Sequence, residues 1–211
     1  MLLLAAPSLR AAPQADGNAV EADWILDRLA RPAPMRTGFV ELRESKLLKQ
    51  PLRLSGEYRR PADGVLVREV RAPYAETTTI RANEATIERA GKSPRTFSLS
   101  RAPELAGLQA SFGALLSGDR AGLAEHYTIE SEGTRGQWTL TLVPKRAELA
   151  AQVRDIVLRG RGAELRCIET RTPGDAAPQR TLLAGAARAA GKVDDAAGLA
   201  ALCHGDGPGA Q

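Results

Sequence analysis

Aromatic residues, cysteine and histidine are all scarce in this 211-residue chain. Aromatic side chains make up 4% of the residues, which leaves little surface for stacking on nucleic-acid bases, and the net charge is only +4. A nucleic-acid-binding function is therefore disfavoured. No apolar run approaches the roughly 18 residues that a membrane-spanning helix needs. The remaining composition, 43% hydrophobic and 26% charged, is that of a globular protein long enough for one large domain.

Catalytic and metal-binding signatures are also missing. The two histidines, His126 and His204, stand outside any recognisable motif with a nucleophile, and the sequence contains no Gly-x-Ser-x-Gly. Neither cysteine has a second ligand at a spacing typical of metal sites. The sequence therefore predicts no enzyme, no bound metal and no cofactor.

The first residues resemble part of a secretion signal. Residues 1–15 have an apolar centre and an alanine-rich end, but no positively charged start. We expect residues 1–17 to be a truncated signal or a disordered terminus, with a cytoplasmic tail as the alternative. In an exported chain, the even pair Cys167 and Cys203 predicts one disulfide, whereas two buried thiols are the alternative.

The most informative stretch is residues 55–73, which predicts two strands joined through an Arg-Pro corner. Pro61 fixes its own φ and favours an extended Arg60, while Asp63 and Gly64 suit a turn that needs positive φ. These residues predict a long hairpin.

Alternation of apolar and polar residues assigns the two faces of this hairpin. Before the turn it places Leu54 and Tyr58 on one face. After the turn, Val65 and Val67 are expected to resume that face.

Helical periodicity occurs in two main places. Residues 18–30 open with Asn18 as a predicted cap, and residues 103–116 interrupt the strands in the middle of the chain, followed by a short helical turn over 119–125. The apolar faces of the two longer helices include Ile25, Leu29, Leu108 and Phe112.

The remaining segments are predicted to be strands separated by turns. Besides the hairpin, they are 35–48, 74–81, 85–89, 95–100, 127–132, 137–144, 153–158, 164–171 and 180–184. In the strand 137–144, Trp138 and Leu140 alternate with threonines. Residues 187–211 are rich in Ala and Gly and predict a tail, with a weak helix over 193–203 and disorder over 205–211. We expect His204 to lie in this disordered tail.

About eleven strands without intervening helices predict a mainly β (α+β) fold with one wide antiparallel sheet over residues 18–186. A twisted sheet of this width must curl or split. If it curls, the amphipathic helices are the available covers, and the result is an open, incomplete barrel with a helical lid. Such a barrel either encloses an apolar cavity or is filled by its helices, and patterning leaves both open.

In this order, several motifs resemble the LolA-like family of outer-membrane lipoprotein carriers. They are Phe39-Val40-Glu41 after the first helix, Gly-x-x-x-Arg-Pro over 56–61, the helical insert 103–116, and Trp-x-Leu-x-Leu-x-Pro over 138–144. The resemblance covers about residues 20–186. Two departures, no Trp or Tyr in 85–89 and the cysteine pair, place the chain nearer a divergent branch thought to move another amphiphile.

The resemblance implies a periplasmic carrier that takes acyl chains from an inner-membrane release complex to an outer-membrane acceptor, and we expect it to act as a monomer. In the family, the Arg of the Arg-Pro corner bonds the lid and holds the empty form closed, a role that falls to Arg60. The residues expected to line the lid or cavity are Leu29, Ile25, Phe39, Leu54, Tyr58, Val65, Val67, Leu108, Phe112, Trp138 and Leu140.

Two alternatives remain open at this point. A lipid-sensing regulator of the RseB type would use a similar fold with a stable protein partner that lipid displaces, although this chain is too short for that type's added domain. A lipid-modifying enzyme would need a polar cluster inside the cavity, with His126 the most plausible member.

Overall fold

The computed structural model describes residues 20–43, 51–82, 84–99, 120–174, 177–191 and 193–205. Its strands are β1 (Met35–Arg43), β2 (Leu52–Arg60), β3 (Val65–Ala72), β4 (Glu76–Arg81), β5 (Glu84–Arg89), β6 (Arg95–Ser98), β7 (Tyr127–Gly133), β8 (Trp138–Pro144), β9 (Asp155–Arg161), β10 (Glu164–Arg171) and β11 (Gln179–Leu183). Its helices are α1 (Ala22–Leu29), α3 (Arg120–His126), α4 (Ala147–Ala150), α5 (Ala184–Ala190) and α6 (Ala196–His204).

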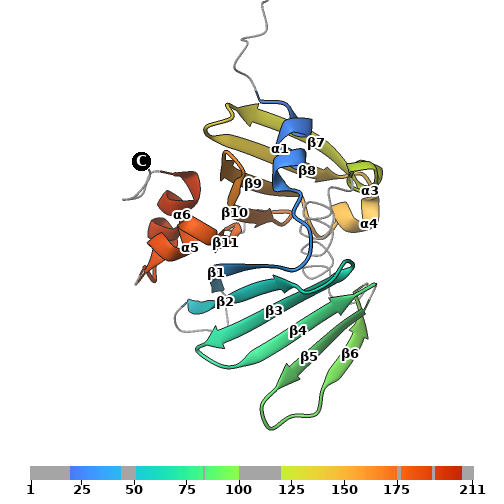
Figure 1. Ribbon diagram of the computed structural model, residues 1–211, viewed down its shortest axis with the longest axis vertical. Helices are drawn as coiled ribbons and strands as arrows, with labels where there is room; N and C mark the ends of the chain where they lie inside the picture. Colours follow the sequence, from blue (N-terminus) through green and yellow to red (C-terminus); the bar gives the residue numbers. More distant parts are fainter. Residues whose placement is uncertain are drawn as a thin grey trace, which may run out of the picture.

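All eleven strands belong to one sheet, in the order β6-β5-β4-β3-β2-β1-β11-β10-β9-β8-β7, and neighbours run antiparallel. The end strands β6 and β7 do not pair, so the sheet curls without closing into a barrel. The predicted fold class is confirmed. Figure 1 shows α1 in front of β7 and β8, α5 and α6 beside β10 and β11, and β3 to β6 as a wing at the bottom.

The inner face of the sheet, on which α1 packs, carries the main core. Side chains point alternately to the two faces of a strand, so each strand sends every second residue inward. The buried inner cluster includes Leu26 and Leu29 of α1 together with residues from β1 to β5 and β7 to β11. Among the described residues, no helix is long and apolar enough to cross a bilayer.

The register of the β2–β3 hairpin corrects the predicted face of Val65 and Val67. Tyr58 pairs with Arg68 and Arg59 pairs with Val67, so Val67 shares the outer side with Arg59. Val65 and Val67 are absent from the inner cluster, which Leu66 and Val70 join instead. The pattern misled because apolar residues occur on both faces of β3, while the inner position 68 is an arginine.

Gly56, in the predicted Gly-x-x-x-Arg-Pro motif, is required by a close approach of two backbones. A β-bulge lies beside it, where Ser55 pairs with Ala72 and Gly56 pairs with Val70. A Cβ at Gly56 would stand 1.9 Å from the carbonyl oxygen of Glu69 and 3.0 Å from the ring of Phe39. The missing side chain therefore lets Phe39 lie across β2.

On the outer face, α5 and α6 cover a second buried cluster. The weak helix predicted over 193–203 is confirmed as α6, and this part of the predicted tail packs against the sheet. The cluster joins Val40 and Leu42 of β1 with Leu199 and Leu202 of α6. Cys167 of β10 and Cys203 of α6 form the predicted disulfide, with an S–S distance of 2.08 Å. Contacts to the sheet hold helices whose sequences alone are weakly helical.

The first helix begins at Ala22, later than the predicted start at residue 18. The backbone of Val20 is bonded to the end of β7 on both sides: its N–H donates to Gly133, and its carbonyl accepts from the Ser131 hydroxyl. These bonds hold Val20 beside the strand, outside the helix. The predicted helix 103–116, with Leu108 and Phe112, and the predicted signal 1–17 lie outside the described residues.

We expect Gly56→Ala to lower the free energy of unfolding by about 3 kcal/mol, because the new Cβ meets backbone that cannot move aside. The matched control is Gly38→Ala in the neighbouring strand β1, where the nearest atom is 3.8 Å away. That control should change stability by about 0.5 kcal/mol or less. Urea unfolding of both variants measures the difference, and equal losses would contradict the close approach.

Candidate functional site

Arg60, the predicted latch, lies at the end of β2 on the inner side of the sheet. Its side chain is 8% exposed. One guanidinium nitrogen, Nη1, donates to the carbonyl oxygen of Arg31 at 2.6 Å, and Nη2 donates to Oδ1 of Asp63 at 2.5 Å. Because Arg31 follows the last residue of α1 by two positions, Arg60 ties the end of this covering helix to the β2–β3 turn.

The same segment is held from a second side by the side chain of Arg31. Its Nη2 donates to the carbonyl oxygen of Ala163, in the β9–β10 turn, at 3.2 Å. The chain that leaves α1 is thus bonded to β2 and to the β9–β10 turn, which lie on opposite sides of β1 in the strand order. Nothing in the sequence indicated this contact, since the two residues are 132 positions apart.

We call the hydrogen bonds from Arg60 to Arg31 and from Arg31 to Ala163 the clamp. Beside the clamp opens a cavity of about 390 Å³, which we call the mouth pocket. It lies between the end of α1, the start of β1, the β9–β10 turn and the β11–α5 junction; its lining residues are Leu29, Arg31, Met35, Arg36, Thr37, Arg161, Ala163, Glu164, Leu165, Leu183 and Ala184. Leu29 and Leu183 also belong to the inner core cluster, so the floor of the pocket continues into the apolar inner face.

The inner face also carries a buried polar cluster that sequence reasoning missed. Arg68 donates from Nη2 to Oε2 of Glu41 at 3.0 Å and from Nε to the hydroxyl of Tyr58 at 3.3 Å, and its guanidinium lies 4.7 Å from the centre of the Phe39 ring. Glu41 also accepts from Gln179 at 2.8 Å. The only available signal was a charged residue at an inward position of a strand.

The pKa values of Tyr58 and Arg68 in this cluster lie far above neutral pH. Burial is the main cause that raises the pKa of Tyr58 from 10.0 to about 12. Burial alone would lower the pKa of Arg68, but Tyr58 and Glu41 outweigh it and the pKa is raised. The inner face is therefore not purely aliphatic, yet Tyr58 and Arg68 are poorly suited to acid–base catalysis at neutral pH.

Most predicted lining residues meet in one place. Ile25, Leu29, Phe39, Leu54, Tyr58, Trp138 and Leu140 all belong to the inner core cluster. Val65 and Val67 do not, and Leu108 and Phe112 lie outside the described residues. His126, the residue considered for an enzymatic role, ends α3 and is exposed.

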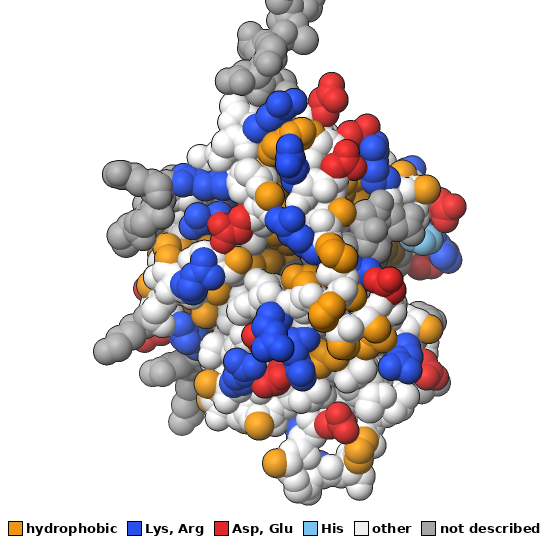
Figure 2. Space-filling view, viewed as in Figure 1, with side chains coloured by type: hydrophobic (Ala, Val, Ile, Leu, Met, Phe, Trp, Pro, Cys, Tyr) orange, Lys and Arg blue, Asp and Glu red, His pale blue; other side chains and the backbone are white. Residues whose placement is uncertain are grey.

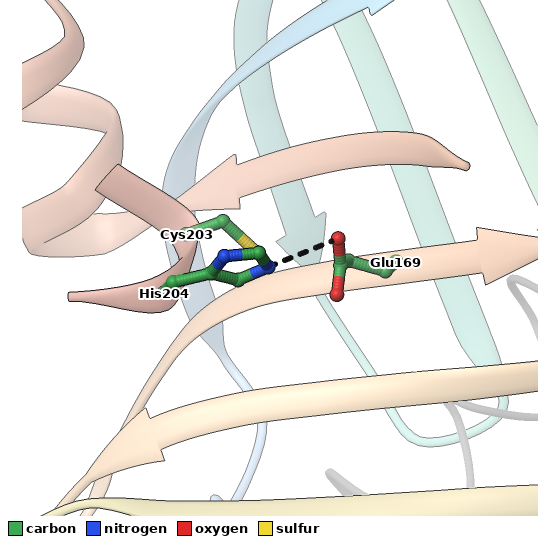
Figure 3. Close-up of side chains that lie close together, drawn as sticks. All are labelled: Glu169, Cys203 and His204. Atoms are coloured by element: carbon green, nitrogen blue, oxygen red, sulfur yellow. Dashed lines mark ion pairs between the residues drawn. The ribbon is translucent and has the colours of Figure 1, made fainter. Parts of the chain in front are cut away.

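A second charged cluster lies on the outer face, beside the disulfide. Glu169 accepts from Arg180 at 2.6 Å and from Arg159 at 3.2 Å, and Nε2 of His204 lies 3.5 Å from its Oε1 (Figure 3). Burial would raise the pKa of Glu169, but these arginines outweigh it and lower the pKa.

This outer cluster is a poor metal site, although Glu169, Cys203 and His204 lie close together. The sulfur of Cys203 is already bonded to Cys167, and two arginines occupy the carboxylate. His204 was predicted to lie in a disordered tail; the structure places it instead in α6, against β10.

The raised pKa of Tyr58 predicts a loss of stability at high pH. The unfolded chain releases this proton near pH 10, while the folded protein keeps it until about pH 12, so stability falls as pH rises between these values. The difference corresponds to on the order of 3 kcal/mol. Urea unfolding from pH 9 to 12 should show a shallower loss for Tyr58→Phe than for the wild type.

Tyr74→Phe, at an exposed tyrosine, is the matched control and should follow the wild-type curve. Burial also raises the pKa of Tyr127, but this residue is present in all three proteins, so the comparison isolates Tyr58. Parallel pH curves for the wild type and Tyr58→Phe would contradict the assignment.

The chain was compared with known proteins. Residues 12–207 match the family model described as outer membrane lipoprotein carrier protein LolA-like. A search of the curated proteins gave no match. Among solved structures, the crystal structure of a LolA superfamily protein from Nitrosomonas europaea is 14% identical over 79% of this chain and 91% of its own, with a TM-score of 0.39. Because the family model matches nearly the whole chain, this protein belongs to the LolA-like family.

Proposed function

We propose that this protein is a periplasmic carrier that shields the acyl chains of a lipoprotein or another outer-membrane lipid and delivers them to an outer-membrane acceptor. Membership of the LolA-like family supports the general role of binding a lipid or lipoprotein. The observation that carries the finer proposal is the clamp at Arg31, because it fastens one end of an amphipathic covering helix without a covalent bond.

The cover must be removable for such a function. Ile25, Leu26 and Leu29 place their side chains against the inner face, while Asp23, Asp27 and Arg28 on the opposite side of α1 are exposed to water. An acyl chain that displaced α1 would meet the same apolar surface. The helix and the cargo are then competing covers for one face.

Competition between α1 and the cargo explains how a tightly bound lipid could be released. Burial of an acyl chain is worth about 0.8 kcal/mol for each methylene, so a chain of roughly sixteen carbons gains on the order of 10 kcal/mol. A carrier that kept all of this energy would not release its cargo. Closing α1 over the empty inner face offsets part of it, and the Arg60 hydrogen bond adds to the closed state.

The proposed partners are an inner-membrane release complex and an outer-membrane acceptor, with this protein acting as a monomer between them. Organic extraction of protein purified from its native periplasm, followed by mass spectrometry, would identify the cargo. A lipoprotein supports the general carrier role, and a diffusible lipid supports the divergent branch of the family.

Arg60→Leu should retain lipid longer than the wild type. A hydrogen bond from a charged, buried donor contributes about 1.5–3 kcal/mol, so its loss shifts the balance between closed and open forms by roughly ten- to hundredfold. We expect more lipid to co-purify with the variant, and a fluorescent acylated peptide to pass more slowly from it to acceptor vesicles.

Arg59→Leu is the matched control, because it makes the same change one residue earlier on the outer face, where Arg59 pairs with Glu69 at 3.0 Å. It should release lipid at the wild-type rate. If Arg60→Leu also releases lipid at that rate, the latch role is wrong.

A further inference from the structure

We propose that one exposed side of α1, together with the β7–β8 turn, docks on an anionic membrane surface through Trp24, Arg28 and Arg135. We call these three residues the docking patch. The inference goes beyond the carrier role, because it names the surface on which the protein rests rather than the cargo that it holds.

The docking patch is built around one aromatic ring. Trp24 packs against the inner core cluster but is only partly buried. The guanidinium carbon of Arg28 lies 5.5 Å from the centre of the Trp24 ring, and that of Arg135 lies 5.4 Å from it. Arg28 comes from α1 itself, whereas Arg135 comes from the β7–β8 turn, and both are exposed. Two like charges therefore converge on one ring at the surface.

No carboxylate is paired with these two charges. Among the residues that the structure describes, neither Arg28 nor Arg135 forms an ion pair. Helical residues four positions apart lie on the same side, so Arg28 shares the side of Trp24 while Asp23 and Asp27 share another. On that other side, Asp23 forms an ion pair with Arg120 of α3.

The patch thus carries an excess of positive charge. Counting the exposed Glu21, which directly precedes α1, still leaves two guanidinium groups against one carboxylate. Figure 2 shows basic side chains above and below a hydrophobic patch over α1, with acidic side chains gathered to its right.

This combination of side chains suits the surface of a bilayer. The ring of tryptophan is apolar with one polar N–H, and tryptophan is enriched where the head groups meet the acyl chains. A guanidinium presents donors in a planar fork that fits two oxygens of a phosphate. A membrane that contains anionic lipid offers both partners at once. An acidic protein segment would match the charges but would supply no apolar layer for the ring.

The docking patch is connected to the mouth pocket through the β9–β10 turn. The N–H of Gly162 donates to the carbonyl oxygen of Arg135 at 3.0 Å. The next residue, Ala163, accepts from Arg31 and lines the mouth pocket. Docking through the patch would therefore bring the pocket and the clamp to the membrane surface, where an amphiphile must be collected or delivered.

The test measures co-flotation of the full chain with vesicles of phosphatidylcholine that contain about 30% phosphatidylglycerol or none. An arginine near an anionic surface strengthens binding about fivefold, so Arg28→Gln/Arg135→Gln should bind the anionic vesicles roughly thirtyfold more weakly than the wild type. Wild-type binding should also weaken between about 50 and 500 mM salt, because salt screens exposed charges.

Arg81→Gln/Arg95→Gln is the matched control. It removes the same charge from two exposed arginines on β4 and β6, away from α1, and should bind the anionic vesicles as the wild type does. Equal weakening in both double variants would mean that the net charge of the protein drives binding, and would overturn the docking patch.

Tryptophan fluorescence locates the contact even if the first double variant does not fold. The chain has two tryptophans, and Trp138 is buried with its Nε1 donating to Gly162 at 3.0 Å. Anionic vesicles with brominated acyl chains should quench the wild type through Trp24. Trp24→Phe should lose that quenching. Quenching that persists in Trp24→Phe, or a bound wild type that is not quenched, would overturn the patch.

A wild type that binds both kinds of vesicle equally, or neither, would overturn the membrane as the partner and favour an acidic protein segment instead. These outcomes are distinct from failure of the carrier role. That role is tested by the lipid that co-purifies with the protein, and it requires no contact between Trp24 and a bilayer.

Discussion

Both faces of this wide antiparallel sheet carry apolar clusters, and each cluster must be covered from water. Here the two covers differ in how firmly they are attached. The outer cover, α5 and α6, is tied to β10 by the disulfide and packs through the second buried cluster. The inner cover, α1, is short and is held at its end by hydrogen bonds from Arg60 and Arg31. The asymmetry leaves only one face that can be uncovered at modest cost.

The strands and the inner core were predictable because burial of one face imposes a period of two on each strand, and turn residues mark where strands end. Tyr58, Trp138 and Leu140 were placed correctly for this reason. The face of Val65 and Val67 was predicted wrongly. Leu66 and Val70 point inward, but Arg68 lies between them on the same face, so this face did not read as apolar in the sequence.

Other parts of the site depend on contacts that no local pattern reveals. The sequence predicted a weak helix over 193–203 but not its place in the fold; α6 lies on the outer face because it packs against β1 and is bonded to Cys167. Arg31 lies between a helix and Pro32, where no local pattern marks it, yet its hydrogen bonds join β2 to the β9–β10 turn. Its two partners come from β2 and the β9–β10 turn, so only the folded chain brings them together.

Arg31 couples the clamp to the mouth pocket in one residue. Its carbonyl receives the hydrogen bond from Arg60, its guanidinium donates to Ala163, and both Arg31 and Ala163 line the mouth pocket. Loss of either hydrogen bond at Arg31 would therefore loosen the attachment of α1 and favour the uncovered inner face, the state that a carrier closed only when empty must reach to take up its cargo.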